Sequence, residues 1–535
     1  IHKLKVDHFL SKLDTPIEIS KKTTVFGIIT ILTIGLIVRL IYFPYDLPLS
    51  LDALSYFAYG FELSETGNFP INFILVNNGW PIFLSLFFSL FGFDNFIGYM
   101  NVERMVSVVI SVSTSIPLYF LCRKFFTRFL SLIGAGLFLL EPRIISNSLL
   151  GISEPIYIIL GVTAIVLFLS HKKWIYLSFA VLAIFSLIRY EGLLLLIPFS
   201  IMFFIKFKNE NNKIIKFLLC IGICLLILFP MSMIRIDTMG HDGFISHYLA
   251  GITVINENVI QGNLDEDDEF PGEEGTNRLI PFIITGLSTL VINFGIIQIP
   301  VFVFFLPLGI MFIIQNRSWR NFDHRHGLLL LCFIFCLIPI LYAHGRLILE
   351  FRYYFILYPI IILICIYGLN KLQPRFINKK IILIPLILGV LILSLFYLEF
   401  NKMDLDLERE AFEITSKAAT ISYAINGDSL HGNYITTANM VSEWPDLKKP
   451  SDVKINKISP SGFNDISEFI IKSKEKGLDH IVVDNLGNGP DYIQYIFDNE
   501  REFPYLEKVF DSKENGYEYH VKIFRINYDY LENRM

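Results

Sequence analysis

Residues 23–43 read TTVFGIITILTIGLIVRLIYF, an apolar stretch with one charged residue, Arg39, near its end. A helix needs about 20 apolar residues to cross the hydrocarbon core of a bilayer. Polar residues 1–22 precede the stretch. No small-x-small cleavage site follows it, and the next residues are Pro44-Tyr45-Asp46-Leu47-Pro48. We therefore interpret it as a first membrane anchor and not as a cleaved signal peptide.

Similar apolar stretches recur along the chain as far as about residue 400. Hydrophobic residues make up 53% of the sequence and charged residues 18%, with 50 Phe and 25 Tyr. The exterior of a soluble protein must be polar, so this composition indicates a membrane protein. We predict an all-α polytopic membrane protein of about eleven transmembrane helices. The predicted spans lie near 23–43, 102–122, 129–141, 154–170, 174–188, 190–206, 214–235, 296–314, 327–343, 352–370 and 380–399.

The apolar run Trp80–Gly92 is ambiguous, and the positions of Lys and Arg decide how to interpret it. Cytoplasmic loops carry an excess of these residues. If the run stays at the interface, the basic segments all fall on one side: 1–22, 123–128, 171–173, 206–213, 317–325 and 371–380. If it crossed, the downstream basic loops would lie outside. We predict that it does not cross, which makes 44–101 and 236–295 external loops of a multi-pass plasma-membrane protein.

The sequence becomes polar near Asn401, and we predict an external soluble α/β domain over 401–535. Together with a cytoplasmic segment 1–22 and a transmembrane domain 23–400, this gives three regions. The elements expected in the C-terminal domain are a helix over 407–424, a helix over 465–476, a buried strand over 480–484, and a hairpin over 509–526 around Asn515-Gly516.

Several functions have no support in the sequence. The net charge of −5 gives no basic footprint for nucleic acid. The six cysteines all lie in apolar stretches, where they read as small packing residues. The acidic run Asp265–Glu269 contains a D-x-D pattern that can hold a divalent cation, but it continues into Pro271-Gly272 and reads as a solvated loop. We expect no cofactor and no metal. Trp80, Tyr56 and Tyr59 are interpreted as interfacial anchors, with sugar stacking as the alternative.

The predicted topology gathers ionisable residues on the external face. Such residues at a membrane boundary are costly and usually have a function. The gathered residues are Asp52, Glu141, Glu154, Arg189, Glu191, His241, Asp242, Arg352 and Tyr353, with Arg39 and Arg104 near the external ends of the first two spans. Each alone has an ordinary explanation: arginines reach headgroups, Glu141 ends a helix, and Asp52 caps one. Their convergence from five or more segments favours a site.

A site of this composition suits glycosyl transfer from a lipid phosphate. A carboxylate can accept the proton of an acceptor group that attacks the anomeric carbon of a sugar. Arginines can bind the leaving phosphate with charge-assisted hydrogen bonds. The membrane helices supply a groove for the lipid tail, and a metal ion is not obligatory.

The same residues resemble a known family over roughly residues 20–400. Their order is Arg39-Leu40, Asp52 with Tyr56, Glu154, Arg189-Tyr190-Glu191-Gly192, and Arg352-Tyr353 before Pro359. This order resembles the polytopic glycosyltransferases of the GT-C fold, especially the branch of the dolichyl-phosphate-mannose–protein mannosyltransferases and aminoarabinose transferases.

The resemblance implies transfer, with inversion, of a hexose such as mannose from a polyprenyl- or dolichyl-phosphate donor to a protein or lipid-linked glycan. It implies that Asp52 is the catalytic acid of the first loop and Glu154 a second acid. The residues expected to bind the donor phosphate or the substrate are Arg39, Arg104, Arg189, Glu191, His241, Arg352 and Tyr353. The usual Asp-Glu pair reads Asp52-Ala53 here, and the Trp-Trp-Asp signature of oligosaccharyltransferases is absent.

Three other functions remain as alternatives. A transporter or flippase of a lipid-linked sugar would place its polar residues near the bilayer midplane, whereas here they lie at one edge. A non-catalytic assembly or receptor protein would need fewer spans. An oligosaccharyltransferase-like enzyme would require a divalent metal.

Overall fold

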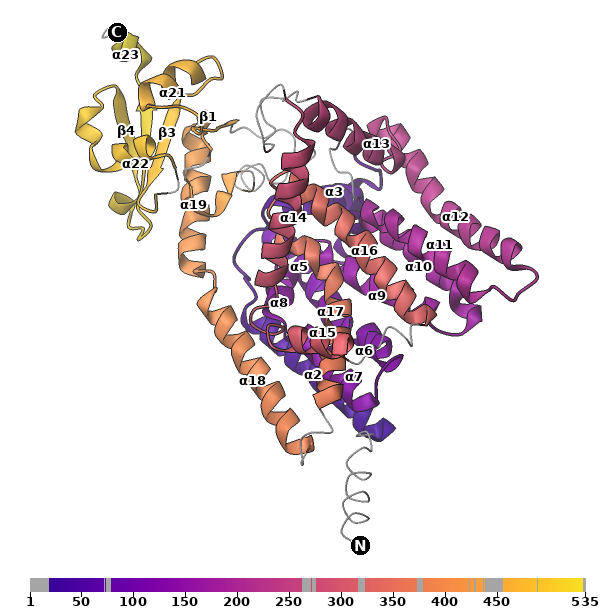
Figure 1. Ribbon diagram of the computed structural model, residues 1–535. Helices are drawn as coiled ribbons and strands as arrows, with labels where there is room; N and C mark the ends of the chain where they lie inside the picture. The colour runs from indigo at the N-terminus through magenta and orange to yellow at the C-terminus, as the bar shows by residue number, and fades with distance from the viewer. Residues whose placement is uncertain are drawn as a thin grey trace. The chain divides into compact units, whose positions relative to one another are not determined.

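The computed structural model describes residues 19–71, 73, 78–261, 271, 276–315, 323–372, 379–422, 424–427, 430–435, 437, 456–487 and 489–532. The chain forms two compact units (Figure 1). We call them the membrane unit, within 1–43, 69–84 and 103–401, and the head unit, within 44–68, 85–102 and 402–535. The predicted acidic run Asp265–Glu269 and most of the predicted segment 1–22 lie outside the described residues.

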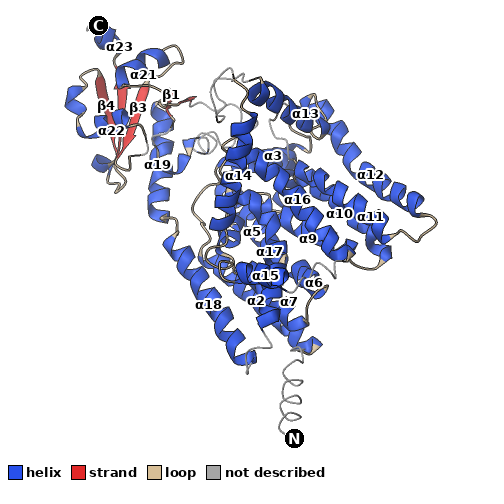
Figure 2. Ribbon diagram, viewed as in Figure 1, coloured by secondary structure: helices blue, strands red, loops and turns tan. Residues whose placement is uncertain are grey.

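Helices build the membrane unit (Figure 2). Those lying wholly or partly in it are α2 (Lys21–Ile41), α4 (Gly79–Phe88), α5 (Phe96–Ser113), α6 (Ser115–Arg123), α7 (Arg128–Leu139), α8 (Pro142–Ser148), α9 (Glu154–Phe168), α10 (Ile175–Ile188), α11 (Leu196–Lys206), α12 (Lys213–Met239), α13 (Ile245–Val254), α14 (Leu279–Ile296), α15 (Phe305–Gln315), α16 (His324–Gly345), α17 (Tyr358–Leu372) and α18 (Lys379–Phe400).

Among the described residues, six helical segments are long and apolar enough to cross a membrane. They are Lys21–Ile41, Phe96–Arg123, Lys213–Met239, Leu279–Ile296, His324–Gly345 and Phe351–Lys371. The pair α7 and α8, bent by 55°, makes a seventh if it is counted as one span. The prediction of a polytopic α-helical membrane protein is confirmed. Our count of about eleven also included shorter apolar helices, such as α9 with 15 residues.

The predicted loop 236–295 is wrong in its second part, because Leu279–Ile296 form an apolar helix. The predicted span 296–314 is accordingly replaced by the end of α14, a turn, and α15. Small and polar residues such as Gly286 and Asn293 had interrupted the apolar pattern. A Cβ atom at Gly286 would come within 3.0 Å of Leu341 on α16, so this glycine allows α14 and α16 to pack closely.

Three of the basic loops meet at one end of the membrane unit, as the topology requires. The Lys124 ammonium donates to Ser170 Oγ at 2.8 Å, and the Lys206 ammonium donates to the Ser170 carbonyl at 3.0 Å. Arg325 donates to the Lys124 carbonyl at 2.7 Å. The assignment of this end to the cytoplasm stays a prediction.

The run Trp80–Gly92 contains the ten-residue helix α4, which is shorter than a span. Trp80 is fully buried, and its indole N–H donates to the Gly151 carbonyl at 3.0 Å. Tyr56 and Tyr59 are also buried. The interpretation of these three aromatic residues as interfacial anchors is therefore wrong; they pack inside the protein.

A five-stranded sheet organises the C-terminal part of the head unit. Its order is β2-β1-β3-β5-β4, in which β1 is parallel to β2 and β3, and β5 is antiparallel to β3 and β4. The strands are β1 (Ala424–Asn426), β2 (Asn456–Ile458), β3 (His480–Asp484), β4 (Leu506–Asp511) and β5 (Val521–Ile526). The helices are α19 (Leu405–Ile421), α21 (Ile466–Ser473), α22 (Asp491–Asp498) and α23 (Tyr528–Glu532).

Both faces of this sheet are buried, because successive residues of a strand point to opposite sides. Ile481 and Val483 belong to the core cluster that contains residues of α21 and α22, and Val482 belongs to the cluster that contains residues of α19. The predicted helices, the strand His480–Asp484 and the hairpin are confirmed, and Gly516 in the hairpin has a φ of 87°. The predicted small α/β domain is thus correct.

The head unit also contains most of the predicted first external loop. Residues Leu51–Thr66 form α3, and its aromatic residues Phe57 and Phe61 contact Phe88 and Phe96 at ring-centroid distances of 5.5 to 6.5 Å. Rings at such distances pack edge to face and stabilise a core. The predicted loop is therefore largely a folded helical segment.

Candidate active site

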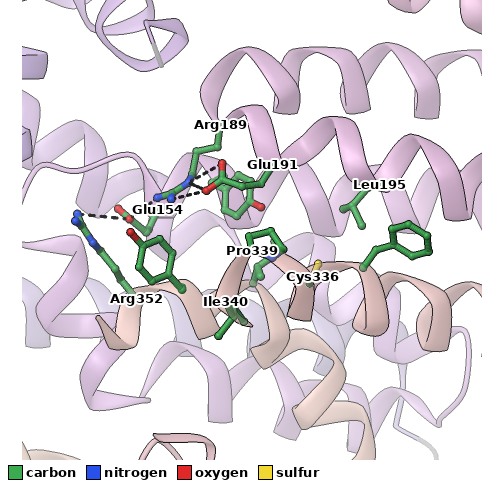
Figure 3. Close-up of a pocket in the computed structure, with 12 residues that line it drawn as sticks. Glu154, Arg189, Glu191, Leu195, Cys336, Pro339, Ile340 and Arg352 are labelled. Atoms are coloured by element: carbon green, nitrogen blue, oxygen red, sulfur yellow. Dashed lines mark hydrogen bonds and ion pairs between the residues drawn. The ribbon is translucent and has the colours of Figure 1, made fainter. Parts of the chain in front are cut away.

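A charged cavity lies in the membrane unit where several helices begin or end (Figure 3). It encloses about 410 Å³ of empty space, part of it open to solvent. Its lining residues are Glu154, Tyr157, Arg189, Glu191, Leu195, Phe335, Cys336, Pro339, Ile340, Arg352, Tyr353 and Ile356. Apolar side chains of α16 line it together with charged residues from the start of α9, the segment that follows α10 and the 3₁₀ helix Phe351–Leu357 before α17. Such a mixture is typical of a ligand site.

Local sequence places the charged side chains. Glu154 is the first residue of α9, and Pro155 beside it is favoured in the first turn of a helix. After α10 the chain is extended at Arg189, and a 3₁₀ helix over Tyr190–Leu195 then brings Glu191 back toward it. A Cβ atom at Gly192 would lie 2.5 Å from the Phe185 ring, so this tight turn requires glycine.

Arg189 is the centre of the charged group. Its Nη1 donates to Glu154 Oε1 at 2.9 Å, and its Nη2 donates to Glu191 Oε1 at 2.7 Å (Figure 3). The guanidinium also lies over the rings of Tyr157 and Tyr353, at 5.5 and 5.6 Å from their centroids. Two carboxylates and two aromatic faces hold this cation, so Arg189 sets the positions of both acids.

Arg352 is the second cation of the cavity and the more accessible one. It lies in the 3₁₀ helix Phe351–Leu357, and its side chain is 24% exposed, against 12% for Arg189. Its Nη1 lies 3.9 Å from Glu154 Oε1, and its Nε lies 3.7 Å from Glu350 Oε2. These ion pairs are longer than hydrogen bonds, and the guanidinium borders the cavity.

Glu154 lines the cavity and has one carboxylate oxygen without a partner among the described residues. Its Oε2 is buried and has no hydrogen-bond partner among the described residues, whereas its Oε1 binds Arg189. Nearly all buried polar atoms in proteins have a partner, and one that lacks a protein partner is expected to bind water or a ligand. The carboxylate therefore offers one oxygen to a hydroxyl or amino group of a bound molecule.

The segment after α12 packs behind the cavity wall. The Tyr248 hydroxyl donates to the Tyr190 carbonyl at 2.8 Å, and the His247 and Tyr190 ring centroids are 3.7 Å apart. Asp242 starts α13 by accepting from the backbone of Ile245 and Ser246 at 2.7 and 2.9 Å. Burial pushes the pKa of Asp242 up, but the bonds from Ser246 and the backbone outweigh it and lower the pKa to about 2. Asp242 is thus a helix cap.

Five of the predicted site residues line the cavity: Glu154, Arg189, Glu191, Arg352 and Tyr353. Three others do not. His241 is exposed after the end of α12, and Arg104 is buried on α5.

Arg39 is the third, and its surroundings differ from the prediction. It is fully buried, and it donates to Ser148 Oγ, Ser111 Oγ and the carbonyls of Gly35 and Leu139 at 3.0 to 3.1 Å. These acceptors use its donors to join α2, α5, α7 and α8. Arg39 thus joins these helices, and its expected contact with the donor phosphate stays a prediction.

Three predicted acids also lie outside the cavity lining: Asp242, Asp52 and Glu141. Asp52 is exposed in the first turn of α3 in the head unit, and its catalytic role stays a prediction. Glu141 is buried and caps α8, since its Oε2 accepts from the Ile144 N–H at 2.9 Å. The described residues contain no group of three His, Cys, Asp or Glu side chains arranged to hold a metal ion.

The sequence interpretation missed the aromatic and apolar lining of the cavity. Tyr157 and the α16 residues Phe335, Cys336 and Pro339 all line it. Tyr157 lies three residues after Glu154 on the same helix. Helical periodicity therefore places the two side chains on one face, and this spacing could have indicated that Tyr157 also lines the site. The α16 residues sit inside an apolar helix and carry no such signal.

The fold is that of the GT-C membrane glycosyltransferases. Two solved structures carry this comparison. ArnT from Cupriavidus metallidurans, bound to undecaprenyl phosphate, is similar to the chain with a TM-score of 0.53 and 11% identity, over 94% of this chain and 98% of that one. The Archaeoglobus fulgidus oligosaccharyltransferase AglB, in complex with an inhibitory peptide and a dolichol-phosphate, gives a TM-score of 0.52 and 11% identity, over 96% of this chain and 75% of that one. No protein-family model and no curated protein matches the sequence.

Proposed function

We propose that the chain is a membrane glycosyltransferase that moves a sugar from a polyprenyl- or dolichyl-phosphate donor to an acceptor on the external face. The observation that carries this proposal is the cavity, in which the open Oε2 of Glu154 lies among the guanidinium groups of Arg189 and Arg352. An acceptor oxygen beside cations suits a sugar hydroxyl beside a phosphate. The shared fold supports it, because ArnT is known with undecaprenyl phosphate and AglB with a dolichol-phosphate.

In the proposed reaction, Arg352 binds the donor phosphate and Glu154 accepts a hydrogen bond from the sugar. The acceptor atom attacks the anomeric carbon, and Asp52 takes its proton. A bond from the acceptor to the anomeric carbon forms as the bond to the phosphate oxygen breaks. The electron pair leaves with the polyprenyl phosphate, whose charge Arg352 meets. This single displacement inverts the anomeric centre.

The remaining parts of the proposal concern the substrates and the setting. We propose a hexose such as mannose as the sugar and a protein or lipid-linked glycan as the acceptor. We propose the plasma membrane as its location, with the C-terminal domain external, because the excess of Lys and Arg in the other set of loops favours a cytoplasmic location for those loops. No divalent metal is needed, since arginine neutralises the leaving phosphate.

The test is a transfer assay with purified protein in lipid nanodiscs. The donors are radiolabelled polyprenyl-phosphate mannose and glucose, a membrane extract supplies acceptors, and each reaction runs with and without EDTA. We expect label on protein or lipid in both conditions, and loss of it in Asp52→Asn and Arg352→Ala. Arg325→Ala, a partly exposed arginine paired with Asp323 at 2.6 Å, is the matched control and should keep full activity.

Two outcomes would contradict the proposal. Absence of transfer from both donors, together with sugar-lipid movement across vesicles, would identify a transporter or flippase instead. Transfer that EDTA abolishes would contradict the metal-independent mechanism and favour oligosaccharyltransferase-like chemistry.

A further inference from the structure

Leu49 in the head unit is held at both of its backbone polar atoms by distant side chains. Its N–H donates to Met100 Sδ at 3.4 Å, and its carbonyl accepts from Thr437 Oγ1 at 2.8 Å. All three residues are buried. Helix α3 begins at Leu51, and Asp52 lies in its first turn. The Thr437 hydroxyl, from the C-terminal part of the chain, thus fixes the backbone three residues before Asp52.

A hydrogen-bond network holds the turn that precedes Thr437. Glu408 on α19 accepts from His431 Nε2 at 2.8 Å and from the Tyr434 hydroxyl. The Tyr519 hydroxyl accepts from the His431 N–H at 2.9 Å and donates to Asp484 Oδ2 at 2.6 Å. Buried networks in which each member is satisfied rigidify the parts that they join. The turn is therefore fastened to α19, to β3 and to the segment before β5.

Gly432 allows this network to close. Its φ is 76°, in the left-handed region that favours glycine. A Cβ atom there would lie 2.2 Å from the Tyr434 ring and 2.7 Å from Glu408 Oε2. Any larger residue would push the tyrosine and the glutamate apart.

Another polar contact between described residues of the same two segments is much weaker. Arg409 Nη2 lies 3.3 Å from Asp46 Oδ2, but these side chains are 42% and 71% exposed. Exposed ion pairs contribute little because water and salt screen them. Of these two contacts, the buried Thr437 hydrogen bond is the one better suited to hold the start of α3.

We propose that the C-terminal domain positions Asp52 for glycosyl transfer, and that Thr437 is the positioning residue that does so through the Leu49 carbonyl. This rests on the proposed function, in which Asp52 takes the proton of the acceptor. A general base must lie within hydrogen-bond reach of that proton, so a shift of the first turn of α3 slows the chemical step. The donor cavity belongs to the membrane unit, so donor affinity should not change.

The test compares Thr437→Val, which keeps the shape and removes the hydroxyl, with Thr437→Ser, which keeps the hydroxyl. We expect kcat to fall about 3- to 10-fold in the valine variant, the effect of losing one hydrogen bond. KM for the polyprenyl-phosphate donor should stay at the wild-type value, and serine should restore kcat. Hydrogen–deuterium exchange of a peptide covering 49–54 should be faster in the valine variant only, with β3 and β5 unchanged.

The readouts separate failure of this proposal from failure of the proposed function. If wild-type protein transfers no sugar, the proposed function fails, and the exchange data still report whether Thr437 holds α3. If wild-type protein is active, Asp52→Asn is inactive and Thr437→Val behaves as wild type, the positioning role is wrong. If hydrogen–deuterium exchange of β3 becomes faster in Thr437→Val, the valine has disturbed the domain itself, and the test is repeated with Thr437→Ala. Unfolding of both Thr437→Val and Thr437→Ala would overturn the proposal, because loss of a contact made only with Leu49 should not unfold β3.

Discussion

Arg39 and Arg189 were expected to do the same work, and their surroundings differ in kind. Arg39 is fully buried, and the acceptors that surround it are two serine hydroxyls and two backbone carbonyls. Arg189 binds two carboxylates at 2.9 and 2.7 Å and borders a cavity. Around Arg39, hydrogen bonds join several helices. Around Arg189, charged groups line a cavity, and Glu154 keeps one oxygen without a partner among the described residues.

The comparison shows what distinguishes a substrate site from a structural charge. A buried guanidinium needs acceptors for its five N–H groups, and at Arg39 neutral acceptors from several helices form four hydrogen bonds with it. At Arg189 the acceptors are acids that also border the cavity, and Glu154 retains an unused oxygen. A hydrogen-bond acceptor without a partner, on a residue that lines a cavity, indicates a binding site; burial of a charge alone does not.

The largest expected effect is on folding, at Arg39. Arg39→Ala removes the hydrogen bonds to Ser111, Ser148 and two carbonyls and leaves a void among the helices. Buried truncations of this size cost roughly 3–5 kcal/mol, and lost hydrogen bonds to a charged group add to this. We expect a large fall in the melting temperature in detergent and in the yield of monodisperse protein, with Arg325→Ala as a control that melts normally.

An Arg39→Ala protein that melts normally and yet fails to transfer sugar would reverse the comparison. It would restore the role in donor binding that the sequence suggested. Arg39→Lys sharpens the test, because lysine keeps the charge but cannot donate in the three directions that Ser111, Ser148 and the Leu139 carbonyl require.

The next effect is on catalysis, at Arg352. We expect Arg352→Ala to lower transfer by about 100-fold or more, as loss of one preorganised donor to developing charge does. Its melting temperature should change less than that of Arg39→Ala, because the Arg352 side chain is partly exposed whereas Arg39 is fully buried. Transfer rates and thermal melts on the same preparations measure both. Equal loss of stability in Arg352→Ala and Arg39→Ala would remove the distinction between the two regions.

Glu154→Gln tests the open oxygen with a smaller change. The amide keeps the shape and an acceptor but removes the charge that Arg189 and Arg352 share. We expect transfer to fall about 10- to 100-fold, within the range of single positioned groups in catalysis. Arg189 keeps Glu191 as a partner, so the protein should stay folded. Unchanged transfer in Glu154→Gln would exclude its carboxylate from the reaction.

Five residues that the sequence analysis grouped together do line one cavity, and there is a physical reason for this. Alternating helices bring their ends to two faces, so a correct topology places Glu154, Arg189 and Arg352 together without any knowledge of packing. It does not say which side of a helix faces inward. Arg39 therefore looked like a boundary charge, although its helix face packs on α7 and α8.

The fold was predictable where the pattern was regular. The strand His480–Asp484 and the hairpin around Gly516 follow from alternation and turn residues, and both are present. The loop over 236–295 was misjudged because residues such as Gly286 break the apolar pattern of α14 while serving its contact with α16. Tyr157 and the α16 wall of the cavity were missed because nothing in an apolar helix marks the side that faces a cavity.

The smallest expected effect is at Arg409, whose side chain is more exposed than those of Arg39, Arg189 and Arg352. Its contacts are Asp46 at 3.3 Å and Asp406 at 3.1 Å, and all three side chains are largely solvated. Pairs of this kind contribute about 0–1 kcal/mol, and salt screens them further. We expect Arg409→Gln to shift the melting temperature only slightly at low salt and not at all at high salt, with transfer unchanged. A drop as large as that of Arg39→Ala would mean that the head unit depends on this surface pair, and burial would then no longer separate structural arginines from dispensable ones.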